Sequence, residues 1–477
     1  MQAFTGRAQA DLITAGRAST AIVEPATSYS VVRGQRDFKK GRRGLGFMAT
    51  RVGRDLRGTG LEPQLNDHAE AFGIDGWTSF GTEKEKVWAL TGRFSFTNIA
   101  GDPARILAVQ RGSQHYYQRP DATHVKINPS ATSLSGYTYR VALNREKGPF
   151  LFNAAYGVIS PGFDSNDIGF TFRGDQKNGH IVGGYRWTQP GRIFRNGGFQ
   201  AGAFRTDDFG GNMTSLGFFS WYWGRFKNYW GFDGSVFVNP ETTSVTATRG
   251  GVAMIRPSAW SWEFAAHSDD RKSVTLNAGT RGGYGKSDSN DQRSVFVSAS
   301  WKPAANVSVS VNPDYSYEKN GAQFVRNIVD PSATATFGTR HVFAQLIQKT
   351  FSAAVRINWT FSPALSLQTY MQPLISSGQY SNFGELARPR SYEFVRYAAG
   401  ALPPGVSDPD FTFKSIRGNA VLRWEFRPGS SAYFVWTQNR QDSDPSGEFR
   451  LRQSFSTLLD AKADNIFLVK FAFGWTR

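Results

Sequence analysis

The chain has 477 residues, with no cysteine, six histidines, and 55 lysines and arginines against 38 aspartates and glutamates, for a formal net charge of +17. The lack of cysteine excludes disulfide bridges, thiol catalysis and cysteine-based metal sites. No run of about 18 apolar residues occurs, which excludes a transmembrane helix. The basic residues mostly alternate within predicted strands, so we expect no nucleic-acid binding and attribute the charge to a membrane surface or an anion-lined pore.

The beginning of the chain carries few structural signals. Residues 1–16 form a segment of unknown structure and lack the apolar stretch of a secretory signal. Strands are predicted at 28–33, 44–56 and 86–98. The long connection that follows, 101–129, contains a candidate short helix, for which Asp102-Pro103 is a start signal.

From residue 133 onward, apolar and polar residues alternate in segments separated by turn residues. Strands are predicted at 133–145, 149–159, 166–174, 178–189, 195–206, 212–224, 228–239, 244–255, 258–268, 271–284, 291–301, 305–317, 321–330, 338–349, 350–361, 364–375, 413–427, 431–440 and 465–477. With the N-terminal strands the total is roughly 22. Counted back from the C-terminus, the insertions 376–412 and 441–464 fall at one end of the sheet, and two of the three short turns that contain proline fall at the other. The third, Lys302-Pro303, also falls there if 321–330 is a strand. Within the second insertion, 452–462 is a candidate amphipathic helix that caps or plugs a pore.

The last strand shows the alternation most clearly. One of its faces is entirely apolar and carries Phe467, Val469, Phe471, Phe473 and Trp475. The opposite face of this strand and of earlier ones is too polar for a dry core and carries Arg356, Arg417, Arg423 and Lys470. Alternation of this kind in segments of about ten residues is typical of a transmembrane β-barrel. We therefore predict an all-β fold, a large antiparallel outer-membrane barrel with long external loops, in which the first set of residues faces lipid and the second faces the lumen.

Closure of such a barrel places a demand on its last strand. An unpaired strand edge in lipid leaves backbone groups unsatisfied, each at a cost of several kcal/mol. We therefore expect 465–477 to pair with 431–440 on one edge and with an early strand of the barrel on the other.

Several stretches of the sequence resemble one family. They are Glu24–Phe38, Tyr116–Asp121, Ser133–Gly136, Ser160–Phe170, Leu365–Pro373 and Asn465–Lys470. Together they are similar to the uncharacterised outer-membrane barrel domain that commonly follows a carbohydrate-binding-module-family-nine-like domain. The resemblance spans nearly the whole chain and implies one barrel domain over 17–477 in the outer membrane of a Gram-negative bacterium. Family members usually carry a signal peptide and the sugar-binding-like module before the barrel, so we expect this chain to be truncated or to be a domain cut from a longer precursor.

The resemblance and the apolar wall together imply three partners. Outer-membrane lipid and lipopolysaccharide would surround the barrel, and the barrel-assembly machinery would insert it. The family usually ends in a terminal aromatic residue, whereas this chain ends Trp475-Thr476-Arg477. A basic cluster either holds lipopolysaccharide phosphates or is a solvated turn; its members are Arg33, Arg36, Lys39, Lys40, Arg42 and Arg43.

Two predicted loops carry polar residues of interest. Asp164 and Asp167 are paired carboxylates, which can act as acid and base or bind a cation. The favoured alternative is a loop whose Asp and Asn side chains satisfy backbone groups. Tyr116, Arg119 and Asp121 either contact sugar or, as we favour, belong to a loop that is tucked into the lumen and tied by an Arg–Asp pair.

These observations favour a channel or uptake protein for a carbohydrate-related or anionic solute. The lumen cations would then select anions, unless they pair with Glu425 and other carboxylates of the lumen. One alternative is a structural or adaptor barrel that anchors a sugar-binding-like module. A second is a carbohydrate-active hydrolase, which is less favoured because no nucleophile elbow, P-loop, zinc motif or dinucleotide fingerprint occurs. No cofactor and no metal are expected.

Overall fold

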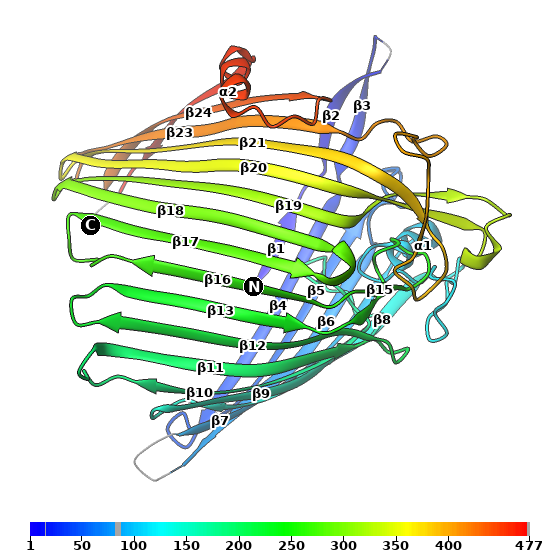
Figure 1. Ribbon diagram of the computed structural model, residues 1–477, viewed down its shortest axis with the longest axis horizontal. Coiled ribbons are helices and arrows are strands. Elements are labelled where there is room, and N and C mark those ends of the chain that lie inside the picture. Colours follow the sequence, from blue (N-terminus) through cyan, green and yellow to red (C-terminus); the bar gives the residue numbers. More distant parts are fainter. Residues whose placement is uncertain (15, 82–86, 475–477) are drawn as a thin grey trace.

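The computed structural model describes residues 1–14, 16–81 and 87–474. Twenty-one of its strands form one antiparallel sheet, which curls so that β4–β9 lie behind β10–β24 (Figure 1). The predicted fold class is confirmed, and the strand number lies close to the expected one. In the described part of the chain, no helix is long and apolar enough to cross a membrane.

The N-terminal part of the sheet is regular. It contains β4 (Ala26–Phe38), β5 (Arg43–Asp55), β6 (His68–Phe80), β7 (Trp88–Ala100), β8 (Ser133–Arg145) and β9 (Phe150–Ile159). The first residues also join it, because β1 (Gln2–Thr5) pairs with β4. The segments β2 (Ala8–Thr14) and β3 (Arg17–Glu24) form a separate hairpin.

The remaining strands complete the sheet in chain order. They are β10 (Gln176–Trp187), β11 (Phe194–Asp207), β12 (Met213–Phe226), β13 (Gly231–Asn239), β16 (Ala259–His267), β17 (Val274–Gly285), β18 (Asn290–Ala304), β19 (Val307–Val329), β20 (Thr339–Ser362), β21 (Leu365–Leu386), β22 (Phe394–Arg396), β23 (Phe411–Arg427), β24 (Ser430–Asp444) and β25 (Ala463–Ala472). Elements in the connections are α1 (Pro103–Arg111), the hairpin of β14 (Thr242–Ser244) and β15 (Met254–Arg256), two short 3-10 turns (Lys286–Asp288 and Thr334–Thr336) and α2 (Leu451–Asp460).

The two ends of the sheet differ. The long connections share one end, the loop end; they are 56–67, 101–132, 160–175, 240–258, 387–410 and 445–462. Most of the loop end is on the right of Figure 1, whereas α2 of the last connection is drawn at the top. The opposite end, the turn end, has short turns, among them 305–306, 363–364 and 428–429. The predicted separation of insertions and proline turns is therefore confirmed, and so is the helix start at Asp102, whose side chain caps α1.

Two predicted strands do not form as expected, and four others merge into two. Residues 166–174 belong to a connection, and 244–255 lies in the connection that holds β14 and β15. The segments predicted separately at 305–317 and 321–330 form the single strand β19, because a register shift between Asn320 and Gln323 absorbs the apparent turn. Likewise 338–349 and 350–361 form the single strand β20. Because two pairs of predicted strands merged, the strand count back from the C-terminus changed by an even number. Each turn therefore stays at the predicted end of the sheet.

The pairing registers assign side chains to the two faces of the sheet. We call inner the face of Thr97, whose Oγ1 accepts a hydrogen bond from Asp164 N of the connection 160–175 at 3.1 Å. Because antiparallel partners point the same way, the registers extend this face from strand to strand. It carries Arg140, Phe204, Trp221, Glu263, Arg356, Arg417, Arg423 and Lys470.

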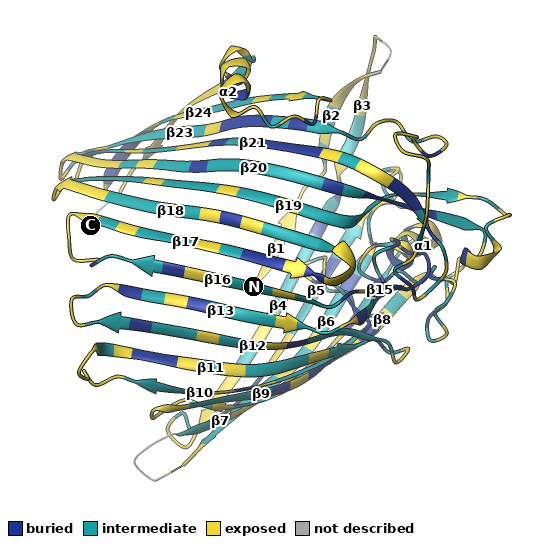
Figure 2. Cartoon of the chain, in the orientation of Figure 1, coloured by how far each residue is buried: buried dark blue, intermediate teal, exposed yellow. Residues whose placement is uncertain are grey.

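The outer face is apolar. On β25 the exposed fractions are 76% for Phe467, 54% for Val469 and 58% for Phe471, and Phe473 just beyond the strand is 65% exposed. Val469 lies opposite Phe434 of β24, so the apolar surface continues across the strand pair. The expected lipid-facing residue Trp475 lies outside the described residues. Most strand residues are half-buried or exposed (Figure 2), as expected of a sheet whose two faces are largely uncovered.

Helix α2 packs on the outer face. Thr457 Oγ1 accepts a hydrogen bond from Lys414 Nζ at 3.2 Å, and the rings of Phe455 and Phe351 meet at 6.0 Å. The registers place both Lys414 and Phe351 on the face opposite to the inner one. The hypothesis that 452–462 caps or plugs a pore is therefore wrong.

The expected pairing of the last strand is confirmed on one edge. β25 pairs with β24 over ten residue pairs, from Ser431 opposite Ala472 to Arg440 opposite Ala463. Among the pairing registers of the described strands, none joins β25 to β1 or β4. Closure through that second edge stays a prediction.

Candidate functional site

The connection 101–132 is the centre of a group of loops at the loop end. Its helix α1 begins where Asp102 Oδ1 accepts a hydrogen bond from Ala104 N at 2.8 Å, with proline in the first turn. Ile106 and Val109 are buried against Ala69 of β6 and Ile99 of β7. We call the connections 101–132, 160–175, 208–212 and 240–258 the loop cluster.

The residues Tyr116–Asp121 tie this cluster together. Arg119 and Asp208 are both buried, with Nη2 and Oδ2 3.6 Å apart. Asp121 Oδ2 accepts a hydrogen bond from Ala253 N at 2.7 Å. Tyr116 adopts a left-handed backbone conformation, with φ of 50°. The tie therefore involves an Arg–Asp pair, but Arg119 pairs with a distant aspartate and not with Asp121.

The two carboxylates of the 160–175 connection have separate partners. Asp164 Oδ2 lies 3.2 Å from His115 Nε2, and its Oδ1 accepts a hydrogen bond from Asn166 N at 2.8 Å. Asp167 forms an ion pair of 2.6 Å with Arg54 and accepts a hydrogen bond from Asn66 at 2.7 Å. Both groups thus hold the loop to its neighbours, as the favoured alternative expects.

Asp164 gives this contact a pH dependence. Burial raises the pKa of its carboxyl, but the hydrogen bonds from His115 and Asn166 outweigh burial and hold the pKa below the ordinary 3.8. A carboxyl whose pKa is lowered in the folded state stabilises that state above its ordinary pKa, and the contribution is lost as the pH falls through the lowered value.

We expect Asp164→Asn to loosen the 160–175 connection by about 1–3 kcal/mol, because a buried network loses its charged member. Amide hydrogen exchange of that connection, corrected for the intrinsic rate, would measure it. In the parent, protection should fall only below pH 3.8, whereas in the variant it should be low and independent of pH in this range. Asp37→Asn, at the turn end, is the control. Parent protection that falls near neutral pH would contradict the assignment.

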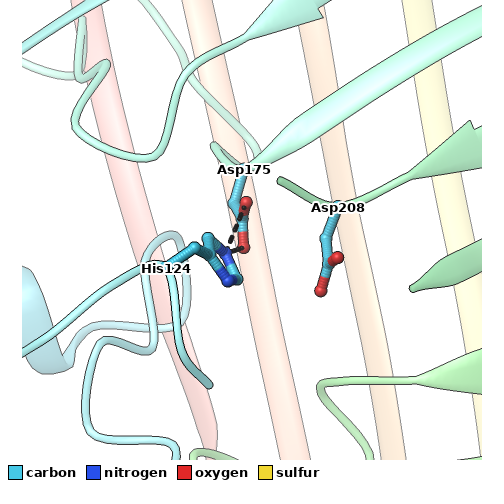
Figure 3. Close-up of side chains that lie close together, drawn as sticks. All are labelled: His124, Asp175 and Asp208. Atoms are coloured by element: carbon cyan, nitrogen blue, oxygen red, sulfur yellow. Dashed lines mark hydrogen bonds and ion pairs between the residues drawn. The ribbon is translucent and has the colours of Figure 1, made fainter. Parts of the chain in front are cut away.

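A second group in the cluster has the composition of a metal site. The ligand atoms of His124, Asp175 and Asp208 lie within 4.8 Å of one another (Figure 3). One histidine and two carboxylates are a donor set that divalent metals accept. Here, however, His124 Nε2 lies 2.9 and 3.0 Å from the two oxygens of Asp175, and both oxygens of Asp208 accept hydrogen bonds from Asn212.

Other residues also contact the two carboxylates of this group. Arg119 lies against Asp208, and Phe209 N donates to Asp175 Oδ1 at 2.9 Å. Every carboxylate oxygen of the group therefore has a hydrogen-bond donor or a positive partner. We interpret the group as a hydrogen-bonded lock between the connections 101–132, 160–175 and 208–212.

The expected lumen cations differ in their partners. Arg423 forms an ion pair of 2.7 Å with Glu425, as one of the two alternatives anticipated. Arg356 lies over the ring of Tyr370, 5.0 Å from its centroid. Among the residues that the structure describes, Arg356, Arg417 and Lys470 form no ion pair, and all three are exposed. These three therefore leave positive charge on the inner face.

Sequence reasoning missed part of the inner face. Arg140 donates to Asn178 at 3.0 Å and contacts His180 at 3.3 Å, and Arg93 lies directly opposite Arg140. It also missed that β11–β13 carry aromatic rings on both faces. The alternation was visible in the sequence, but a strand with aromatic residues on both sides gives no sign of which side faces inward.

The comparisons with known proteins give a family and a few distant structures. A family model described as a domain of unknown function (DUF5916) matches residues 1–473. No curated protein matches the chain. A ferric enterobactin receptor mutant from Pseudomonas aeruginosa, in complex with enterobactin, is 10% identical over 87% of this chain and 73% of that chain, with a TM-score of 0.39. A chain of the FpvAI–pyocin S2 complex is 9% identical over 91% and 68%, with a TM-score of 0.33.

Proposed function

The chain belongs to the uncharacterised DUF5916 family, and we propose that it is an outer-membrane uptake barrel for a carbohydrate-related or anionic solute. One observation carries the proposal: the antiparallel sheet has an apolar outer face and a polar, cationic inner face. Apolar side chains on the outside of such a sheet are stable in lipid, and polar ones on the inside need water.

We also propose which molecules contact the barrel. Outer-membrane lipid and lipopolysaccharide would contact the outer face, and the barrel-assembly machinery would insert the chain. In this orientation the loop end faces outward and the turn end faces the periplasm, since barrels of this type have short periplasmic turns. The basic cluster around Lys39 and Lys40 lies at the turn end, and Arg33 of that cluster pairs with Asp75 at 2.5 Å.

The solute would pass between the loop cluster and the cationic wall. Arg356, Arg417 and Lys470 bring positive charge to water on the inner face. Salt screening limits the reach of exposed charges to about 8–10 Å under physiological conditions. These charges would therefore act more strongly on a solute in a lumen narrowed by loops than in an open one. The loop cluster supplies that narrowing.

A structural or adaptor barrel is the second candidate. The lock of His124, Asp175 and Asp208 and the buried pair of Arg119 and Asp208 favour it, because they hold the loop cluster in place. A carbohydrate-active hydrolase gains no support, since Asp164 and Asp167 are occupied by Asn166, His115 and Arg54.

Solute efflux from liposomes separates the two candidates. Purified protein would be reconstituted into vesicles loaded with an anionic dye, a cationic dye of similar size, or a neutral sugar. We expect the anionic dye and the sugar to leave faster than from protein-free vesicles, and the cationic dye to lag behind. Efflux equal to that of protein-free vesicles for all three would reject the uptake proposal and favour the adaptor.

A further inference from the structure

The inner face of β11, β12 and β13 carries a continuous group of aromatic rings. Following the registers, Phe204 lies opposite Gly217, Phe219 opposite Phe237, and Trp221 opposite Ser235. We call Phe204, Phe219, Trp221 and Phe237 the aromatic strip. Because these residues share a face with Arg140 and Thr97, they point away from the lipid side of the sheet.

The rings of the strip are in mutual contact. Phe219 lies centrally: its centroid is 6.2 Å from Phe204, 4.9 Å from Trp221 and 5.6 Å from Phe237. The rings of Phe219 and Phe237 are stacked, at an angle of 26°. Trp221 and Phe237 complete the group at 6.2 Å. These distances are those of packed aromatic pairs, so the strip is one rigid surface.

Glycines on the neighbouring strands let two rings lie close to the wall. A Cβ added to Gly202 would lie 2.7 Å from Phe219 Cζ, and one added to Gly217 would lie 2.3 Å from Phe204 Cζ. The tips of both rings therefore lie over a glycine of an adjacent strand. Only a residue without a side chain permits this approach.

The strip is accessible and has polar neighbours. Trp221 is 43% exposed although it faces away from lipid. Gln200 and Ser235 lie opposite it on the two adjoining strands, and Glu263 of β16 lies opposite Ser235. His180 lies opposite Phe204, so the contact between His180 and Arg140 lies at the other border of the strip.

We propose that the aromatic strip is a binding subsite for a saccharide chain that passes along the inner face. An exposed apolar surface in a polar interior marks a place where a ligand covers it. Sugar rings match this surface because one side of the ring is lined with C–H groups, which pack on aromatic faces, while hydroxyl groups at the edge reach polar side chains. Gln200, Ser235 and Glu263 supply donors and acceptors at that edge. The inference rests on the proposed function and names its solute class.

The test measures current through the reconstituted protein in a planar bilayer while a linear malto-oligosaccharide is added. We expect the sugar to block the parent current in a concentration-dependent way. Trp221→Ala and Phe219→Ala should each weaken the block by about tenfold, as expected for the loss of one stacking ring. Gly217→Ala should also weaken it, although all four rings remain, because the new Cβ would lie 2.3 Å from Phe204 Cζ and displace that ring.

Phe218→Ala is the matched control. Phe218 neighbours Phe219 on β12, faces outward and is 51% exposed, so its loss should leave the block unchanged. A parent current that malto-oligosaccharide does not block would overturn the saccharide assignment. So would a stronger block by benzoate, which would indicate a planar aromatic solute, or a block equally weakened by Phe218→Ala.

A second readout separates this inference from the proposed function. If the parent passes no current, the uptake proposal fails, and titration calorimetry of the detergent-solubilised protein with the same sugar still tests the strip. Heat of binding that disappears in Trp221→Ala would support the subsite in a protein that is not a channel. Binding that is absent in the parent, or unchanged in Trp221→Ala, would reject it.

Discussion

Replacing residues 103–130 by a short Gly-Ser linker is expected to raise the single-channel conductance several-fold. The connection 101–132 holds the loop cluster together through His115, Arg119 and Asp121, so its removal would release the other connections from the interior. The linker fits because the ends of the connection already meet: Gly101 N donates to Thr132 O at 3.0 Å. A sheet of about 20 strands leaves a wide lumen when no loop fills it.

The matched control removes a segment of the outer face. Replacing residues 451–460, which form α2, by a similar linker should leave the conductance as in the parent, because α2 packs outside the wall. Equal conductance of the parent and the 103–130 variant would show that the loop cluster does not limit the current.

Arg356→Glu combined with Arg417→Glu is expected to reverse the ion selectivity from anions to cations. Both side chains are exposed on the inner face, and neither forms an ion pair in the described part of the chain. Reversal of their charge therefore acts directly on ions in the lumen. The shift of the reversal potential in a salt gradient measures the effect.

Arg423 provides the comparison for this variant. Its guanidinium is already paired with Glu425 at 2.7 Å, so Arg423→Gln should shift the reversal potential far less than the double change. A larger shift from Arg423→Gln, or none from the double change, would mean that the current does not pass along this part of the wall.

The architecture was predictable from the sequence because it rests on local patterns. Side chains of a strand alternate between two faces, so the polar series that ends at Lys470 and the apolar series that ends at Phe473 could be separated without coordinates. Turn residues such as Pro363 indicated which connections lie at the turn end of the sheet. The predicted strand boundaries were wrong near Asn320, where the polar residues lie at a register shift within β19 and do not form a turn.

The loop cluster was not predictable, because its contacts join distant parts of the chain. Arg54 and Asp167 are 113 residues apart in the sequence, and Asp121 and Ala253 are 132 apart. No local pattern specifies such partners. Asp164 and Asp167 looked like one acidic pair, whereas the fold directs them to different neighbours.

The aromatic strip shows another limit of pattern reasoning. Around Trp221 both faces of β12 are aromatic, since Phe218 and Tyr222 lie on one side and Phe219 and Trp223 on the other. Alternation of polarity therefore vanishes where the inner face becomes apolar. Only the registers, followed from strands with a polar inner face, identify which rings point inward.

The reversal potential of the parent protein across a salt gradient in a planar bilayer decides whether this sheet encloses an uptake path for anionic solutes. We expect discrete channel openings with a reversal potential on the anion side, because Arg356, Arg417 and Lys470 leave positive charge on the inner face. A reversal potential on the cation side, or a membrane that stays silent after verified insertion of the protein, would contradict the claim that this sheet encloses an uptake path for solutes.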